Sequence, residues 1–179
     1  MMRRQTEINY EMKLLSSLEK VFQDETPVYR PECLVLSALW DETVSFQAAY
    51  TGDCFMRERL EVRVVSELEK WVRVRTVEQV PVGRATNVIV DDNYLKTTPG
   101  MYPDLLRDLP GDHKVIVCSH QWRSLWVDVE VTEEIPAGDY EVEIQLLKED
   151  EIVCSAKMKL HVVGVTLPKQ EIMHTVWMH

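Results

Sequence analysis

Two tryptophans, Trp71 and Trp126, are the residues whose type and position most plainly suggest a chemical role. Two-residue alternation places Trp71 on the polar face of a predicted strand with Arg73 and Arg75, and it places Trp126 on a polar face with Asp128. A tryptophan on an outer face leaves a large apolar area in water unless something covers it. Three alternatives follow: another part of the same domain folds over the ring, a further domain docks on it, or the ring stacks on a sugar.

Residue patterns that would support catalysis or metal binding are weak in this sequence. The five histidines are dispersed, and His174 and His179 lack a third ligand nearby, so no metal site is predicted. Asp91–Asn93 could bind calcium, but an Asx-type turn is the commoner interpretation. The acids of Glu133-Glu134 and Glu149–Glu151 are sequence neighbours in predicted turns, whereas a general acid–base pair needs two separately supported carboxyls. We therefore predict no catalytic residue, no metal and no cofactor.

Composition limits the classes of partner. The chain of 179 residues is long enough for one well-buried domain, and its net charge of −10 argues against nucleic acid and anionic membrane surfaces. No window approaches the ~18 apolar residues of a membrane span, and the N-terminal residues lack the apolar core of a secretion signal. The four cysteines are scattered, with Cys118 and Cys154 in strand-like contexts, so we predict free thiols and a cytoplasmic location.

Alternation of apolar and polar residues is the dominant pattern along the chain. It appears at residues 44–50, 60–64, 72–76, 123–131, 140–146 and 154–162, with shorter candidates at Leu34–Leu39 and Asn87–Val90. Short strands with one apolar face, separated by turns such as Pro136–Asp139, are typical of a sandwich. We predict an all-β fold: an antiparallel two-sheet β-sandwich of the immunoglobulin-like type over residues 1–168.

Two segments do not fit this pattern. Residues Asp91–His113 have no sustained period, so we expect a long irregular excursion in the middle of the domain, with one helical turn near Leu105-Leu106. In Glu11–Phe22 the apolar residues fit helical spacing, but a strand followed by an irregular segment fits equally well.

The last predicted hairpin can be aligned by charge and by the pleat. If Lys148 pairs with Ile152, the loop is Glu149–Glu151, and the register sets two glutamates opposite two lysines on the outer face: Glu143 opposite Lys157 and Glu141 opposite Lys159. A slip by one residue would set outward charges against inward apolar residues, so the pleat excludes it.

Several phrases, in their order, match a known family. They are Ser16–Phe22 with Asp24, Glu42–Ala49, Tyr102–Leu105, Ser124–Val127, Pro136–Tyr140 and Leu167–Gln170. Together they resemble the N-terminal β-sandwich of bacterial glycoside hydrolase family 123 and related uncharacterised hydrolase-like proteins. The final His174–His179 looks like the start of that family's (β/α)₈ barrel. The resemblance covers nearly the whole chain.

The resemblance implies a supporting role. Characterised family members cleave N-acetylgalactosaminides by substrate-assisted catalysis, with an Asp–Glu pair deep in the barrel, and no position here corresponds to that pair. We therefore expect a non-catalytic sandwich domain that packs on a barrel, with residues 169–179 as the truncated start of that barrel or a tail. Trp177, in this apolar segment, is a candidate interface residue together with Trp71 and Trp126. The alternatives are a carbohydrate-binding module, or a free-standing protein that forms a homodimer through its tail.

Overall fold

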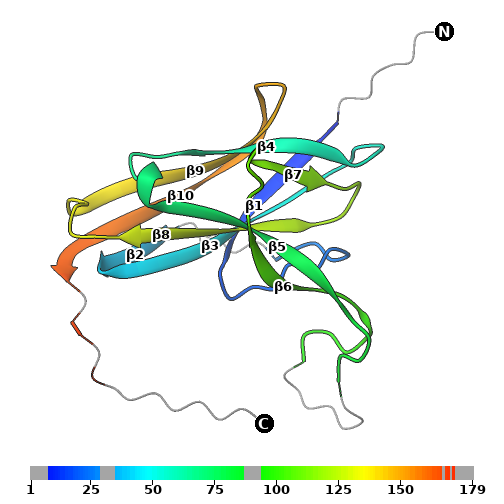
Figure 1. The fold of residues 1–179 in the computed structure, drawn as a ribbon, viewed down its shortest axis with the longest axis horizontal. Helices are drawn as coiled ribbons and strands as arrows, with labels where there is room; N and C mark the ends of the chain where they lie inside the picture. Colours follow the sequence, from blue (N-terminus) through cyan, green and yellow to red (C-terminus); the bar gives the residue numbers. More distant parts are fainter. Residues whose placement is uncertain (1–7, 29–34, 87–93, 167, 170, 172–179) are drawn as a thin grey trace.

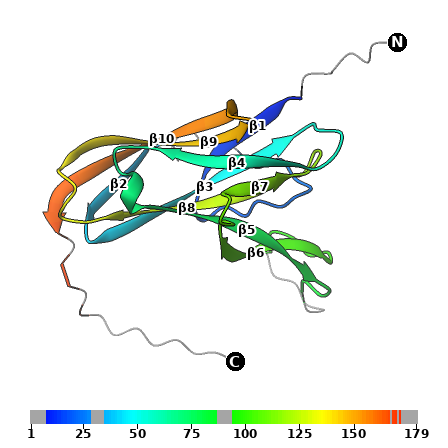
Figure 2. The same ribbon diagram turned by 45° about the horizontal axis from the view of Figure 1, so that its top comes forward.

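Two sheets of five strands each face one another in the computed structural model, which describes residues 8–28, 35–86, 94–166, 168–169 and 171 (Figures 1 and 2). Sheet A has the order β1 (Tyr10–Ser16), β3 (Glu42–Gly52), β8 (Arg123–Val131), β5 (Val72–Val82) and β6 (Gly100–Asp108). Sheet B has the order β2 (Val35–Trp40), β10 (Glu151–Thr166), β9 (Gly138–Lys148), β4 (Glu58–Val65) and β7 (Lys114–Val117). The predicted all-β two-sheet fold is confirmed, although β2 pairs with β10 in parallel.

The main core lies between the two sheets and follows the predicted alternation. In β8 every second residue from Leu125 to Val131 is fully buried, and in β9 Val142, Ile144 and Leu146 are buried in the same way. Phe46 of β3 and Met158 of β10 belong to the same cluster. Because side chains of a strand alternate between the two faces, these positions close the space between the sheets while their neighbours face outward.

The N-terminal segment is a strand followed by an irregular stretch, and the helical alternative is wrong. β1 pairs with β3 from Tyr10 opposite Gly52 to Ser16 opposite Phe46. Leu14 points into the main core, whereas Leu15 is buried on the opposite face of sheet A. Leu18, which a helix would have placed on its apolar face, is 89% exposed. The apparent helical spacing arises because the two leucines serve two different cores.

The predicted excursion contains an edge strand, β6, where a helical turn was expected. β6 pairs with β5, and the register shifts between Glu78 opposite Leu105 and Gln79 opposite Pro103. This bulge leaves Asp104 without a ladder partner, and it breaks the two-residue period that would have identified the strand. Proline is tolerated at an edge because no second neighbour needs its missing N–H. Residues 87–93, which include the predicted Asn87–Val90 strand and Asp91–Asn93, lie outside the described part.

The register of the last hairpin is as predicted, but its turn is not. Glu143 lies opposite Lys157 and Glu141 opposite Lys159, with Lys157 Nζ 3.6 Å from Glu141 and 3.8 Å from Glu143. The loop, however, has two residues, Glu149 and Asp150, with φ of 50° and 69°, so that Lys148 pairs with Glu151. Positive φ at both positions matches the strand twist. A bulge between Ile152 and Cys154 absorbs the extra residue and restores the pleat.

Candidate functional site

The segment that follows β1 covers part of the outer face of sheet A. Val21 is buried there in a second apolar cluster with Leu15, Ala49 and Trp122. Hydrogen bonds fix the path of the segment: Gln79 Nε2 donates to the Val21 carbonyl at 3.2 Å, and the Trp122 amide donates to the Gln23 carbonyl at 3.0 Å. This face of the sheet is therefore partly covered by the chain's own backbone.

Gln47 is the polar centre of this cover. Its side chain is 3% exposed and stands on the outer face of β3. The amide nitrogen donates to the Glu19 carbonyl at 2.7 Å and to the Ser16 carbonyl at 3.2 Å, and the amide oxygen accepts from Ser124 Oγ at 2.9 Å. One side chain thus joins β8 to the Ser16 carbonyl at the end of β1 and to the Glu19 carbonyl of the covering segment, so its loss would remove several buried hydrogen bonds at once.

Trp126 lies beside this cover, partly exposed on the outer face of β8. Its indole N–H donates to Asp128 Oδ1 at 2.7 Å, and the same oxygen accepts from Ser45 Oγ at 2.7 Å. The other carboxylate oxygen of Asp128 forms an ion pair with Arg75. Because its one polar atom is already bonded to a fixed carboxylate, the Trp126 ring is held in one orientation with an apolar surface free for contact.

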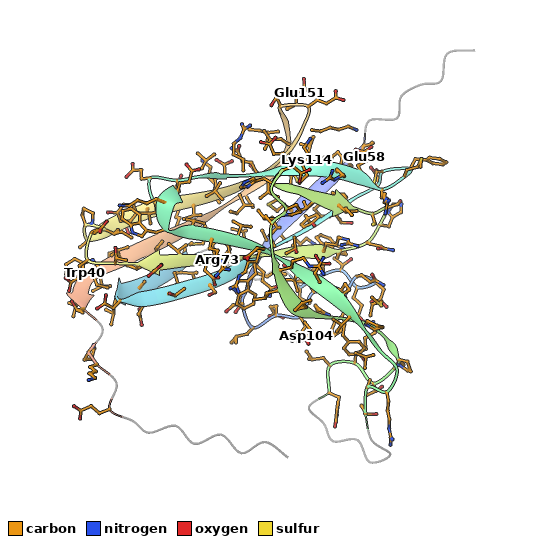
Figure 3. All side chains as sticks on the ribbon, viewed as in Figure 1. Trp40, Glu58, Arg73, Asp104, Lys114 and Glu151 are labelled. Carbon is orange, nitrogen blue, oxygen red and sulfur yellow. The ribbon has the colours of Figure 1, made fainter. Side chains whose placement is uncertain are left out.

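A small pocket of about 250 Å³ opens over this ring. Its apolar lining comes from Trp126, Val77, Leu106 and Pro103, and its polar lining comes from Ser17, Glu19, Lys20, Gln47 and Asp104. Lys20 and Asp104 are exposed, and Glu19 is half-buried, so the lining includes one cationic and two acidic residues around an aromatic floor. Figure 3 shows Asp104 on β6, on the part of sheet A that runs toward the projecting β5–β6 ribbon. Such a lining suits a small ring with hydroxyl groups at its edge and an apolar face.

Trp71 does not share a face with Arg73 and Arg75, contrary to the prediction. It ends the short 3₁₀ turn η2 (Glu69–Trp71), and β5 begins only at Val72, so the two-residue alternation does not extend back to it. The ring is partly buried against the main core, with Lys70 Nζ 3.9 Å from its centroid. Trp71 and Trp126 therefore do not form one surface, and Trp177 lies outside the described residues.

A larger hollow of about 590 Å³ lies between β4 and β5, at the open side of the sandwich. Its charged rim is largely paired within the chain: Arg63 with Glu61 at 3.4 Å, Arg73 with Asp108 at 2.7 Å, and Asp112 with Arg59 at 2.7 Å. Arg73, labelled in Figure 3, lines this hollow. No Phe, Tyr or Trp lines it, which is why the Trp126 pocket is the stronger candidate.

Some residues important to this architecture were not identified from the sequence. Gln47 lies in the run Phe46–Tyr50, where only alternate residues were expected to be buried. The small Ala49, two residues further along the same face, was the one available signal that this second face is covered. Trp40 closes the end of the sandwich where β10 ends, and its indole N–H donates to the Ile135 carbonyl at 2.8 Å (Figure 3).

The remaining chemistry of the described part is plain. Cys54, Cys118 and Cys154 are free thiols, and burial raises the pKa of Cys154 to about 12. Cys33 lies outside the described residues. In the ranges that the structure describes, no group of three metal-ligating side chains is found, and no helix is long and apolar enough to cross a membrane.

Comparison with known proteins shows a fold and no family. No protein-family model matches the chain, and no curated protein matches it. Among solved structures, a family 123 glycoside hydrolase from Clostridium perfringens is similar, with a TM-score of 0.57 and 10% identity over 89% of this chain. The match covers 27% of the hydrolase, so this chain spans about a quarter of its length.

Two further solved structures are less similar. AvmM, which catalyses macrocyclization in alchivemycin A biosynthesis, matches 92% of this chain and 93% of its own length with a TM-score of 0.42 and 10% identity. The N-terminal domain of PorA matches 87% of this chain and 99% of its own length with a TM-score of 0.40 and 9% identity. At these scores the two structures carry no argument about this protein.

Replacing Gln47 by Leu should destabilise the domain by about 2–4 kcal/mol, because the buried hydrogen bonds that Gln47 makes to Ser124, Ser16 and Glu19 would be lost. Urea denaturation measures the effect. Ser124→Ala should cost markedly less in the Gln47→Leu background than in the parent chain, since their shared hydrogen bond is already lost. A neutral Gln47→Leu variant, within about 0.5 kcal/mol of the parent, would contradict the role assigned to this network.

Proposed function

We propose that this chain is a non-catalytic β-sandwich domain of a larger glycoside-hydrolase-like protein, and that it supports or docks on a C-terminal (β/α)₈ barrel. The observation that carries the proposal is the fold-level likeness to part of a family 123 hydrolase, over 89% of this chain and 27% of the enzyme. The ordered phrases from Ser16–Phe22 to Leu167–Gln170 agree with it independently. A domain of this kind would contribute packing surface, while the chemistry would take place in the barrel.

Among the described carboxyls, the shifts in pKa favour the ionised form. Five of them have a shifted pKa, and every shift is downward: Asp24, Glu58, Asp112, Glu134 and Glu143. At Glu134 the hydrogen bond from Lys70 lowers the pKa. At Glu58 burial acts to raise the pKa, but hydrogen bonds from Lys148 and Tyr10 outweigh it. A glycosidase acid needs the opposite, a raised pKa that keeps a proton near neutrality.

The other expectations remain proposals of the same kind. We infer a cytoplasmic location, supported by the free thiols of Cys54, Cys118 and Cys154. A homodimer through residues 169–179 is the alternative to docking on a barrel. Both predict that Trp177 contributes to an interface, and neither requires nucleic acid or a membrane surface.

The purified chain should not hydrolyse chromogenic N-acetylgalactosaminides or N-acetylglucosaminides above the buffer rate. A family 123 hydrolase assayed beside it serves as the positive control. The proposal fails if the chain turns over substrate and one Asp or Glu substitution abolishes that turnover. The second part of the proposal, docking on a barrel, is tested in the gene, where a reading frame for a barrel should continue beyond His179.

A second candidate function, binding of a saccharide ring, is favoured by the Trp126 pocket. Its volume of about 250 Å³ suits one sugar ring, and the ring orientation of Trp126 is fixed by Asp128. Aromatic stacking on the apolar face of a sugar is typically combined with edge hydrogen bonds, which Lys20, Asp104 and Ser17 could make. The site could act within a larger hydrolase-like protein, so the two functions are compatible.

Titration with N-acetylgalactosamine, followed by amide chemical shifts, should give saturable changes at Lys20 and Asp104 with a millimolar Kd, equivalent to about 4 kcal/mol. Trp126→Ala should abolish the response, whereas Trp71→Phe, the matched control at the other tryptophan, should keep it. Equal responses in both variants, or linear and unsaturable shifts, would exclude this pocket as the binding site.

A further inference from the structure

Four strands lie at the sheet edges, and β2 is the least protected of them. β1 contains Glu11 and Lys13, β7 begins with Lys114, and β6 carries Pro103 and a bulge. Charges, prolines and bulges at an edge discourage further strand pairing. β2, with the sequence VLSALW, contains no charged residue and no proline. Its first residue, Val35, is 57% exposed.

The free edge of β2 presents backbone donors to the outside. The amide of Leu39 donates to Glu42 Oε2 at 2.7 Å, not to β10. Amide directions alternate along a strand, so the amides of Val35 and Ser37 point the same way, away from β10. Outside the strand ladders, no hydrogen bond from either amide to the described part of the chain is found. Glu42 therefore protects one end of this edge, and the other end remains available.

The chain leaves the sandwich beside this edge. Thr166, the last residue of β10, lies opposite Trp40, the last residue of β2. Figure 3 shows β10 ending next to Trp40. Reaching the far side of β2 requires two strand spacings, about 10 Å. The five residues 167–171 can span up to about 16 Å at ~3.3 Å per residue. The next segment, residues 172–177, has six residues, which is also the length of β2.

We infer that Ile172–Trp177 adds to the free edge of β2 as an antiparallel strand and extends sheet B. The segment, IMHTVW, is rich in strand-forming residues and carries no Asp, Glu, Lys or Arg, like the edge that it would cover. The pairing would satisfy the amides of Val35 and Ser37 and shield the exposed Val35 side chain. This inference goes beyond the proposed function, because it concerns how the sandwich binds its own following segment.

Amide hydrogen exchange of the full chain and of a chain lacking residues 172–179 tests the pairing. The amides of Val35 and Ser37 should exchange at least several-fold more slowly in the full chain, and the difference should not depend on protein concentration. Equal exchange in the two chains overturns the inference. Protection that grows with concentration also overturns it, since the occupant of the edge would then be a second copy.

A pair of substitutions at one position sharpens this test. Ser37→Pro removes the amide that faces the free edge but no hydrogen bond to β10, whereas Ser37→Ala keeps the amide. Proteolytic cleavage within residues 172–177 should accelerate several-fold in Ser37→Pro and remain at the parent rate in Ser37→Ala. Identical cleavage in the two variants contradicts the pairing. If Ser37→Pro does not fold, the comparison of full and shortened chains decides alone.

Discussion

The buried amide of Gln47 is the constraint on which the distinctive part of this sandwich depends. A buried amide without partners costs about 1–3 kcal/mol for each unsatisfied group, so its hydrogen bonds to Ser16, Glu19 and Ser124 favour the covered arrangement. One of these partners is the Ser16 carbonyl at the end of β1, and another is the Glu19 carbonyl of the segment that follows β1. Satisfying Gln47 therefore holds that segment on the outer face of sheet A, and the segment in turn builds one wall of the Trp126 pocket.

The two sheets consequently have different outer faces. Sheet A carries a second apolar cluster and a concave site on its outer face. The outer face of sheet B carries exposed pairs such as Lys157 with Glu141, which select register and contribute little stability. Ligand recognition through a fixed aromatic ring suits the first face. The free edge of sheet B, near the end of β10 beside Trp40, suits contact with the chain that follows.

The sequence was most informative where one strand obeyed one period. Alternation identified β8, β9 and β10 and their buried faces, and charge pairing set the register of the last hairpin. Prediction from the sequence pattern failed where a residue distant in the chain changed the local pattern. Pro103 and the bulge at Asp104 concealed β6, the two cores of Leu14 and Leu15 imitated a helix, and the 3₁₀ turn shifted Trp71 off the expected face. Burial of Gln47 depends on a segment far from it in the chain, so no local period could reveal it.

The side-chain amide of Gln47 reports most directly on whether this covering layer exists in solution. Nuclear magnetic resonance should find its two NH₂ protons in slow exchange with water, with cross-relaxation to backbone protons of Ser16 and Glu19, as its 3.2 Å and 2.7 Å hydrogen bonds to those carbonyls require. Rapid exchange at the rate of an exposed glutamine, with no contact to that segment, would contradict the covered face and the Trp126 pocket built on it.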